Sequence, residues 1–276
     1  MTAAPRYAVF GHPIAHSLSP RLHALFAAQT GIVPEYVAID AAPDTFAGDL
    51  CAFFAAGGCG ANVTLPHKTA AFELADVRTA TAQRLGVVNV LTRLPDGRIE
   101  ADSNDGAGML ADLRDRRAVD PRGCNVLLLG AGGAARAAAF ALLDAGVRGL
   151  TIANRTLEHA QSLIGALPGP ARVVRWGALD RSDAFDLIVN ATSAGVQHAA
   201  LALPAAVAHA STIAYDLSYG AAARPFLDWA KGAGCAAAFD GLGMLVETAA
   251  ASFAHWHGVR PDVDAVFGKI NADSRP

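Results

Sequence analysis

The 276-residue sequence has few cysteines and lacks the spacings that define a disulfide framework or a zinc site. No two of them form a Cys-x-x-Cys pair; they are Cys51, Cys59, Cys124 and Cys235. The N-terminus also lacks the charged segment and long apolar run of a secretory signal. We therefore expect free thiols and a cytoplasmic protein.

Other absences narrow the class of protein further. The net charge of −3 provides no basic field to neutralise phosphates, so nucleic acid is not expected as a partner. No uninterrupted apolar stretch reaches membrane-spanning length, so no membrane association is expected. No metal is expected either, because the nine histidines show no ligand spacing.

The sequence does contain a glycine-rich turn between an apolar run and an alanine-rich helix. The run covers residues 125–129, and the helix extends towards Gly146. Together they match G-x-G-x-x-G/A, the dinucleotide-binding fingerprint. The turn consists of Gly130, Ala131, Gly132, Gly133, Ala134 and Ala135. Gly130 permits the tight turn, Gly132 lets the backbone approach a pyrophosphate, and the helix N-terminus offers free N–H groups to phosphates.

The strand after this helix indicates which dinucleotide binds. Residues 150–153 are apolar and lead into Asn154, Arg155 and Thr156. An NAD site usually has an acid here to accept from the ribose 2′-hydroxyl, and this strand end has none. Arg155 instead supplies a guanidinium suited to a 2′-phosphate. The sequence therefore predicts NADP rather than NAD.

The chain as a whole predicts an α/β fold with two α/β domains. In the first unit we expect strands at 6–10, 35–40 and 61–65, a hairpin at 87–102, and helices capped by Ser19 and Asp44. A helix at 106–116 leads to the glycine turn. The second unit continues as a Rossmann-type, doubly wound domain, with strands at 173–174, 186–190, 212–216 and 236–239. The last helices begin near residue 241.

Polar side chains in the first unit follow several expected strands. Loops at one side of a parallel sheet converge, so these side chains could surround a small polar ligand. They are Ser17 with Ser19, Asn62 with Thr64 and Lys68, Asn89, and Asp102 with Asp105.

These segments, taken in order, resemble the shikimate dehydrogenase family over nearly the whole chain. The matching motifs are residues 8–20, 60–68, 88–89, the glycine turn, 154–156, 190–193 and 240–244. The resemblance implies an NADP-dependent oxidoreductase that interconverts 3-dehydroshikimate and shikimate in chorismate and aromatic amino acid biosynthesis. It also implies a substrate domain of residues 1–105 plus 241–276, to which the C-terminal helices return, and a Rossmann domain of residues 106–240. A monomer or homodimer is expected.

The resemblance further implies a role for each matching residue. Lys68 would be the acid/base group and Asp105 its partner. The substrate would contact Ser17, Ser19, Thr64, Asn89, Tyr219 and Thr248. NADP would contact Gly130, Ala131, Gly132, Gly133, Ala134, Asn154, Arg155, Thr156 and Thr192, with Leu217, Gly241 and Met244 near the nicotinamide.

Three departures from the family pattern bear on the ligand. The family usually has Asn-Thr-Asp where this chain has Ser103, Asn104 and Asp105, and Gln where it has Thr248. A second basic residue after Asn-Arg-Thr is replaced by His159. The first two departures leave open an alternative substrate, quinate or another shikimate-like polyol. A non-catalytic NADP-binding regulator is the third hypothesis, and the presence of both Lys68 and Asp105 argues against it.

Overall fold

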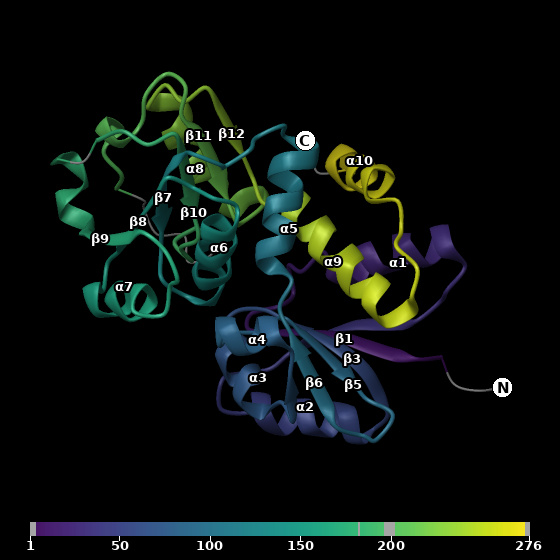
Figure 1. Ribbon diagram of the computed structural model, residues 1–276. Helices are drawn as coiled ribbons and strands as arrows, with labels where there is room; N and C mark the ends of the chain where they lie inside the picture. The colour runs from purple at the N-terminus through teal and green to yellow at the C-terminus, as the bar shows by residue number, and fades with distance from the viewer. Residues whose placement is uncertain (1–3, 182, 196–201, 274–276) are drawn as a thin grey trace. The chain divides into compact units, whose positions relative to one another are not determined.

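Two six-stranded sheets organise the residues that the computed structural model describes, which are 4–181, 183–195 and 202–273 (Figure 1). Unit 1 comprises residues 1–108 and 245–276, and unit 2 comprises residues 109–244. The chain leaves unit 1 within helix α5 (Asp105–Ala111) and returns within α9 (Leu242–His257). The predicted α/β class with two α/β domains is confirmed.

The sheet of unit 1 is mixed, in the order β2-β1-β3-β5-β6-β4. Its strands are β1 (Arg6–Gly11), β2 (Glu35–Asp40), β3 (Gly58–Val63), β4 (Val77–Arg78), β5 (Val90–Arg93) and β6 (Ile99–Asp102). The parallel pairs β1–β2 and β1–β3 join an antiparallel β5–β6 hairpin through β3. Its helices, besides α9, are α1 (Ser19–Thr30), α2 (Phe46–Ala55), α3 (Lys68–Leu74), α4 (Ala80–Leu85) and α10 (Val263–Asp273).

Alternation along β1 distributes its side chains between two layers of helices. Ala8 and Phe10 belong to a buried cluster with the aromatic residues of α2. Tyr7 points to the other face and stacks on Trp256 of α9, with ring centroids 4.7 Å apart. Figure 1 shows α9 beside α1 on that face, with α2, α3 and α4 on the opposite one. Helix α9, from the C-terminal part of unit 1, therefore completes the core of this unit.

In unit 1, the sequence predicted two helix N-caps at the wrong residue and did not predict two short elements. Ser19 and Asp44 were expected as N-caps, but the N-caps are Leu18 and Thr45, and neither makes a side-chain cap hydrogen bond. Both N-caps have right-handed helical dihedrals, and their carbonyls accept from Leu22 and from Asp49. The short elements β4 and α4 were not predicted.

The sheet of unit 2 is parallel, in the order β12-β11-β10-β7-β8-β9. This is the doubly wound order of a dinucleotide-binding domain. Its strands are β7 (Asn125–Leu129), β8 (Gly149–Asn154), β9 (Ala171–Arg175), β10 (Leu187–Asn190), β11 (Ile213–Asp216) and β12 (Ala237–Phe239). Its helices are the π-helical turn η1 (Asp112–Arg116), α6 (Gly133–Asp144), α7 (Leu157–Ile164) and α8 (Arg224–Gly232), with 3-10 turns η2 (Trp176–Arg181), η3 (Ala205–Val207) and η4 (Gly220–Ala222).

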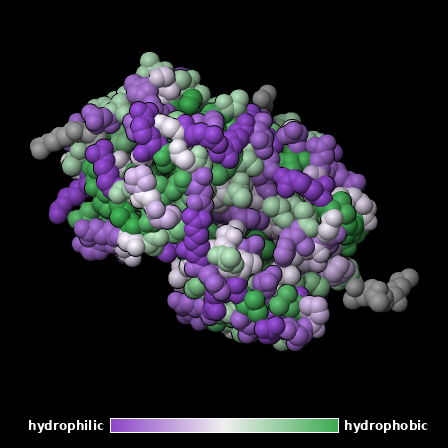
Figure 2. Space-filling model, viewed as in Figure 1, coloured by the Kyte–Doolittle hydropathy of each residue, from purple (hydrophilic) through white to green (hydrophobic). Residues whose placement is uncertain are grey.

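Helices cover both faces of this parallel sheet, as its apolar strands require. Leu128 and Ile152 lie in a cluster with residues of α6 and α7, whereas Leu127 and Ile188 lie in a second cluster with residues of α8. Figure 2 shows hydrophilic residues spread over the visible face of both units, among hydrophobic ones. None of the helices in the described part of the chain is both long and apolar enough to cross a membrane.

Candidate functional site

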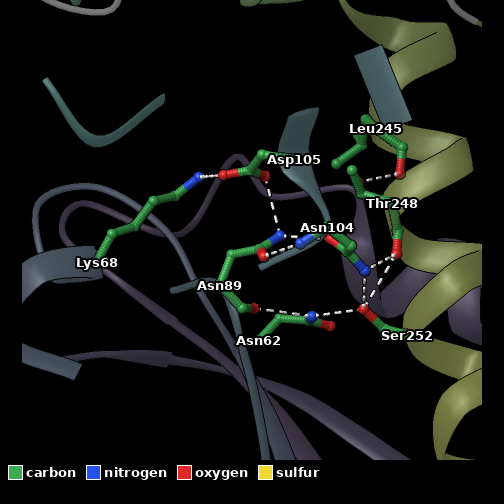
Figure 3. A network of polar contacts seen from close by, with 8 residues as sticks. All are labelled: Asn62, Lys68, Asn89, Asn104, Asp105, Leu245, Thr248 and Ser252. Carbon is green, nitrogen blue, oxygen red and sulfur yellow. Dashed lines mark hydrogen bonds and ion pairs between the residues drawn. The ribbon is translucent and has the colours of Figure 1, made fainter. Parts of the chain in front are cut away.

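Three of the predicted site residues of unit 1 contact one another directly. Lys68 begins α3, Asp105 begins α5, and Asn89 immediately precedes β5. Lys68 Nζ forms an ion pair with Asp105 Oδ2, and Asn89 Nδ2 donates to Asp105 Oδ1 at 2.9 Å (Figure 3). Lys68 is 9% exposed and Asp105 6%, so their charges are paired where water has little access.

The start of α3 holds Lys68 in place through its neighbour His67. The His67 ring stacks on Phe46 with centroids 4.1 Å apart, and its Nε2 lies 2.7 Å from the carbonyl oxygen of Ala41. A carbonyl only accepts, so Nε2 carries the hydrogen. Burial lowers the pKa of His67, and the bond to Ala41 opposes this in part. A neutral, anchored His67 thus fixes the first turn of α3.

The position of Asn89 differs from the expected one in an informative way. Asn89 was expected just after a strand, yet it comes just before β5. Because β5 runs antiparallel to β3 and β6, its first residue lies at the edge where both of those strands end. The Asn89 carbonyl accepts from the Val63 N–H at 3.0 Å, and the Asn89 N–H donates to the Asp102 carbonyl at 3.1 Å. The antiparallel hairpin therefore brings Asn89 to the carboxyl edge.

The predicted hydroxyl residues of unit 1 follow two neighbouring strands. Ser17 and Ser19 come after β1, and Thr64 comes after β3, whose residue Val63 pairs with Phe10. Ser17 Oγ accepts from the Ser19 N–H at 3.3 Å, and the Thr64 N–H donates to the Phe10 carbonyl at 2.9 Å. The three hydroxyls thus follow strands that end at one edge of the sheet.

A network of polar contacts joins the Lys68–Asp105 pair to α9 (Figure 3). Asn89 Nδ2 donates to Asn104 Oδ1 at 2.7 Å, and Asn104 Nδ2 donates to the Thr248 carbonyl and to Ser252 Oγ, both at 3.1 Å. The hydroxyl of the predicted substrate residue Thr248 donates to the Leu245 carbonyl at 3.0 Å. Thr248 therefore joins the network through its backbone.

Sequence reasoning did not include three members of this network among the site residues. Asn62 was named only as a polar residue and Asn104 only as a departure, and Ser252 was overlooked. Ser252 lies four residues after Thr248, the spacing that places two side chains on one face of a helix, so this signal was present in the sequence. The buried Ser103 hydroxyl, in contrast, has no hydrogen-bond partner among the described residues.

The glycine turn of unit 2 has the geometry that a phosphate-binding backbone requires. Gly130 has φ +106°, and a Cβ there would lie 2.9 Å from the Ala191 carbonyl oxygen. A Cβ on Gly132 would meet nothing within 4 Å, so the backbone is open to a ligand. Gly132 is the N-cap of α6 and has no side chain, so no cap occupies the first N–H groups of the helix. The residues present fit a dinucleotide pyrophosphate.

The end of β8 has the features expected of an NADP site. Asn154 ends the strand beside β7, where Ala153 pairs with Leu129, and Asn154 Nδ2 donates to the Thr156 carbonyl at 2.8 Å. Arg155 and Thr156 are exposed, and no acid stands at this strand end. His159, in the first turn of α7, is exposed as well.

A buried pair of side chains links the ends of β10 and β11. Asn190 Nδ2 donates to Asp216 Oδ2 at 2.8 Å, and Asn190 Oδ1 accepts from the Thr192 hydroxyl at 2.8 Å. Asp216 Oδ1 accepts from the Ser218 N–H at 2.7 Å. Burial raises the pKa of Asp216 to about 6, and these hydrogen bonds oppose the shift. The pair was not predicted, and it ties together the loops that carry Thr192 and Leu217.

The remaining predicted residues of unit 2 lie after β11 and β12. Tyr219 is half-buried and precedes the η4 turn. Gly241 is packed so closely that a Cβ would lie 2.4 Å from the Leu217 carbonyl oxygen. Met244 is buried in the cluster that contains Tyr215. Within the described residues, no group of three or more histidine, cysteine, aspartate and glutamate side chains is placed to hold a metal ion.

Comparison with known proteins identifies the family. The family model described as the shikimate dehydrogenase substrate binding domain matches residues 9–91, and that described as shikimate / quinate 5-dehydrogenase matches residues 112–205. A shikimate dehydrogenase (NADP(+)) of Xanthomonas campestris pv. campestris is 53% identical over 271 residues, which cover 97% of this chain and 95% of the relative.

Solved structures agree with this assignment. The crystal structure of an Ael1 enzyme from Pseudomonas putida has a TM-score of 0.86 and 43% identity, covering 96% of this chain and 98% of that one. Shikimate 5-dehydrogenase from Thermus thermophilus, solved in complex with NADP(H) and shikimate, has a TM-score of 0.83 and 34% identity, covering 97% and 99%. With such identity over nearly its whole length, the chain belongs to the shikimate dehydrogenase family.

Proposed function

We propose that this chain is an NADP-dependent shikimate dehydrogenase that interconverts 3-dehydroshikimate and shikimate, a step of chorismate and aromatic amino acid biosynthesis. The observation that carries the proposal is the buried Lys68–Asp105 ion pair in a chain 53% identical to a shikimate dehydrogenase (NADP(+)). The Thermus relative, solved with NADP(H) and shikimate, supports the same ligands here.

Lys68 carries the proton in this proposal. Bound NADP(H) supplies or accepts the hydride. In the direction of reduction, Lys68 Nζ gives a proton to the ketone oxygen as that oxygen becomes an alkoxide, and in oxidation the same nitrogen takes the hydroxyl proton. Asp105 holds the ammonium by charge, and Asn89 orients Asp105. The buried setting strengthens both contacts.

The substrate is held by short polar side chains. Ser17 and Ser19 after β1 and Thr64 after β3 provide hydroxyl donors for its carboxylate and hydroxyls. We also assign substrate contacts to Asn89, to Thr248 and, in unit 2, to Tyr219.

NADP is held at the carboxyl ends of the unit 2 strands. The backbone from Gly130 to Ala134 and the start of α6 receive the pyrophosphate, which the open space at Gly132 supports. Asn154, Arg155 and Thr156 receive the 2′-phosphate. The loops tied by the Asn190–Asp216 pair, with Gly241 and Met244, complete the nicotinamide site.

Turnover of shikimate by a Lys68 variant tests the proposal. Lys68→Ala should lower kcat by about 10²- to 10⁴-fold, the usual effect of losing a general acid or base. The dissociation constant for NADP should stay unchanged, because Lys68 is assigned no contact with the cofactor. Lys231→Ala, which removes an exposed lysine of α8, should retain wild-type turnover. Full turnover by Lys68→Ala would overturn the role of Lys68.

A substrate panel separates the alternatives. With NADP present, kcat/KM for shikimate should exceed that for quinate, whereas the reverse order would make the chain a quinate dehydrogenase. A regulator would bind NADP and turn over neither compound. This comparison matters because Ser103, Asn104 and Thr248 depart from the family pattern.

We further propose that the protein is cytoplasmic and forms a monomer or homodimer. The four cysteines are unpaired, which supports a reducing compartment. Sedimentation equilibrium would distinguish the two assembly states.

A further inference from the structure

We propose that Asn104 is a positioning residue for proton transfer. Acting through Asn89, it determines which atom of the Asn89 amide faces Asp105, and so leaves the second oxygen of Asp105 to Lys68 (Figure 3). This inference rests on the proposed role of the Lys68–Asp105 pair.

The amide of Asn104 makes every hydrogen bond that its donors allow. Both Nδ2 hydrogens are used, one on the Thr248 carbonyl and one on Ser252 Oγ. Its Oδ1 accepts from Asn89 Nδ2 at 2.7 Å. Asn104 therefore has no donor left to offer a substrate, and its side chain acts on its neighbours.

Two contacts with Asn104 fix the orientation of the Asn89 amide. The Asn104 backbone N–H donates to Asn89 Oδ1 at 2.9 Å, while Asn104 Oδ1 accepts from Asn89 Nδ2. A flip of the Asn89 amide would place its NH2 group against the Asn104 N–H and its oxygen against Asp105 Oδ1. Each of these pairs is donor against donor or acceptor against acceptor, so the flipped state is excluded.

The orientation of Asn104 is in turn fixed by Ser252, which is fully buried. Ser252 Oγ donates to the Thr248 carbonyl at 3.0 Å, so its single hydrogen is used. Its lone pairs accept from Asn62 Nδ2 at 2.9 Å and from Asn104 Nδ2. Ser252 Oγ can therefore only accept from Asn104, so the NH2 group of Asn104 must face Ser252 and its Oδ1 must face Asn89. This fixes the donor and acceptor of each hydrogen bond along the path from Ser252 to Asp105.

The network also keeps the Asn89 amide directed at Asp105 although other polar groups could compete for it. Asn89 Nδ2 has two hydrogens, one for Asn104 Oδ1 and one for Asp105 Oδ1. Without the Asn104 side chain, the Asn89 amide would keep the bond from the residue 104 N–H but would lose the acceptor for one Nδ2 hydrogen, so it would be less firmly held as the neutral donor that favours the pairing of Asp105 with Lys68.

Kinetics of Asn104→Leu, which has a similar volume and no polar atoms, test the inference. We expect kcat for shikimate oxidation to fall about tenfold, the effect of losing roughly 1.4 kcal/mol of hydrogen bonding in the transition state. KM for shikimate and for NADP should change less than about twofold. Ser252→Ala removes one of the two acceptors of Asn104 Nδ2, together with the contacts of Ser252 with Asn62 and Thr248, and should lower kcat in the same sense but less.

A double-mutant cycle with Asn89→Ala shows whether Asn104 acts through Asn89. If it does, adding Asn104→Leu to Asn89→Ala should change kcat less than about twofold, because the route of action is already lost. Additive effects, or a rise in the KM for shikimate with kcat unchanged, would show that Asn104 contacts the substrate or acts elsewhere, and would overturn the inference.

Exchange of the Asn89 side-chain amide protons, followed by NMR, does not depend on catalysis. These protons should exchange slowly in the wild type and at least about tenfold faster in Asn104→Leu, since the loss of one hydrogen bond opens the amide. Unchanged exchange would overturn the inference even in an active enzyme. Absence of shikimate turnover in the wild type, with faster exchange in the variant, would instead refute the proposed function alone.

Discussion

The buried side chain of His23 in α1 should make unit 1 sensitive to acid. His23 is 1% exposed and stacks on Tyr36 with ring centroids 3.8 Å apart, and Phe26, Phe253 and Trp256 surround it. Neither ring nitrogen has a hydrogen-bond partner within the described parts of the chain. Burial, and to a smaller extent the charge of His257, lower its pKa from 6.5 to about 3.

The pH dependence follows from this difference between the folded and unfolded states. Below pH 6.5 the unfolded chain binds a proton at His23 that the folded protein does not bind until about pH 3. The free energy of unfolding is therefore unaffected above pH 6.5 and falls as the pH drops through this window. Each pH unit costs about 1.4 kcal/mol, so the loss at pH 4.5, two units below the usual pKa, is about 3 kcal/mol.

Urea unfolding of His23→Phe, followed by circular dichroism at pH 7.5 and pH 4.5, measures this loss. Phenylalanine has a similar size and carries no proton, so the variant should lose about 3 kcal/mol less than the wild type between the two pH values. His16→Phe, which alters an exposed histidine, should lose as much as the wild type. Equal losses in His23→Phe and the wild type would refute the reasoning, since other titrating groups cancel in the comparison.

Three further predictions concern unit 2. Arg155→Ala should raise the KM for NADP about 10- to 100-fold and leave that for NAD unchanged, because a charged hydrogen bond contributes about 1.5–3 kcal/mol; equal changes would exclude a 2′-phosphate contact. Gly243→Ala should lower the free energy of unfolding, measured in urea, by about 1–3 kcal/mol, because its Cβ would lie 1.9 Å from buried Asp112 Oδ1. The control Gly232→Ala, whose Cβ would meet nothing within 4 Å, should not lower this free energy. Because the raised pKa of Asp216 means that folding favours its protonated form, Asp216→Asn should gain about 3 kcal/mol of stability relative to the wild type as the pH rises from 4 to 6 in urea titrations; an unchanged difference between the two proteins would contradict this.

Patterns of a few consecutive residues predicted much of the fold. The glycine turn between strand and helix predicted the doubly wound unit, and the apolar strands predicted most of both sheets, because period and turn chemistry are local properties. The caps predicted at Ser19 and Asp44 were each wrong by one residue, because Leu18 and Thr45 are the N-caps and their carbonyls accept from the Leu22 and Asp49 N–H groups. The strand β4, two residues long, carried too little pattern to be seen.

The sequence by itself determined the family, the kind of cofactor and the candidates Lys68 and Asp105, since these follow from motifs of a few consecutive residues. Only the tertiary structure decided what those candidates touch. The bond from Asn104 to Ser252 joins positions 148 residues apart, and no local period encodes such a contact. It exists because α9 returns to the unit 1 sheet beside the carboxyl edge, where long-range packing of the helix brings half-buried Asn104 and buried Ser252 within hydrogen-bonding distance.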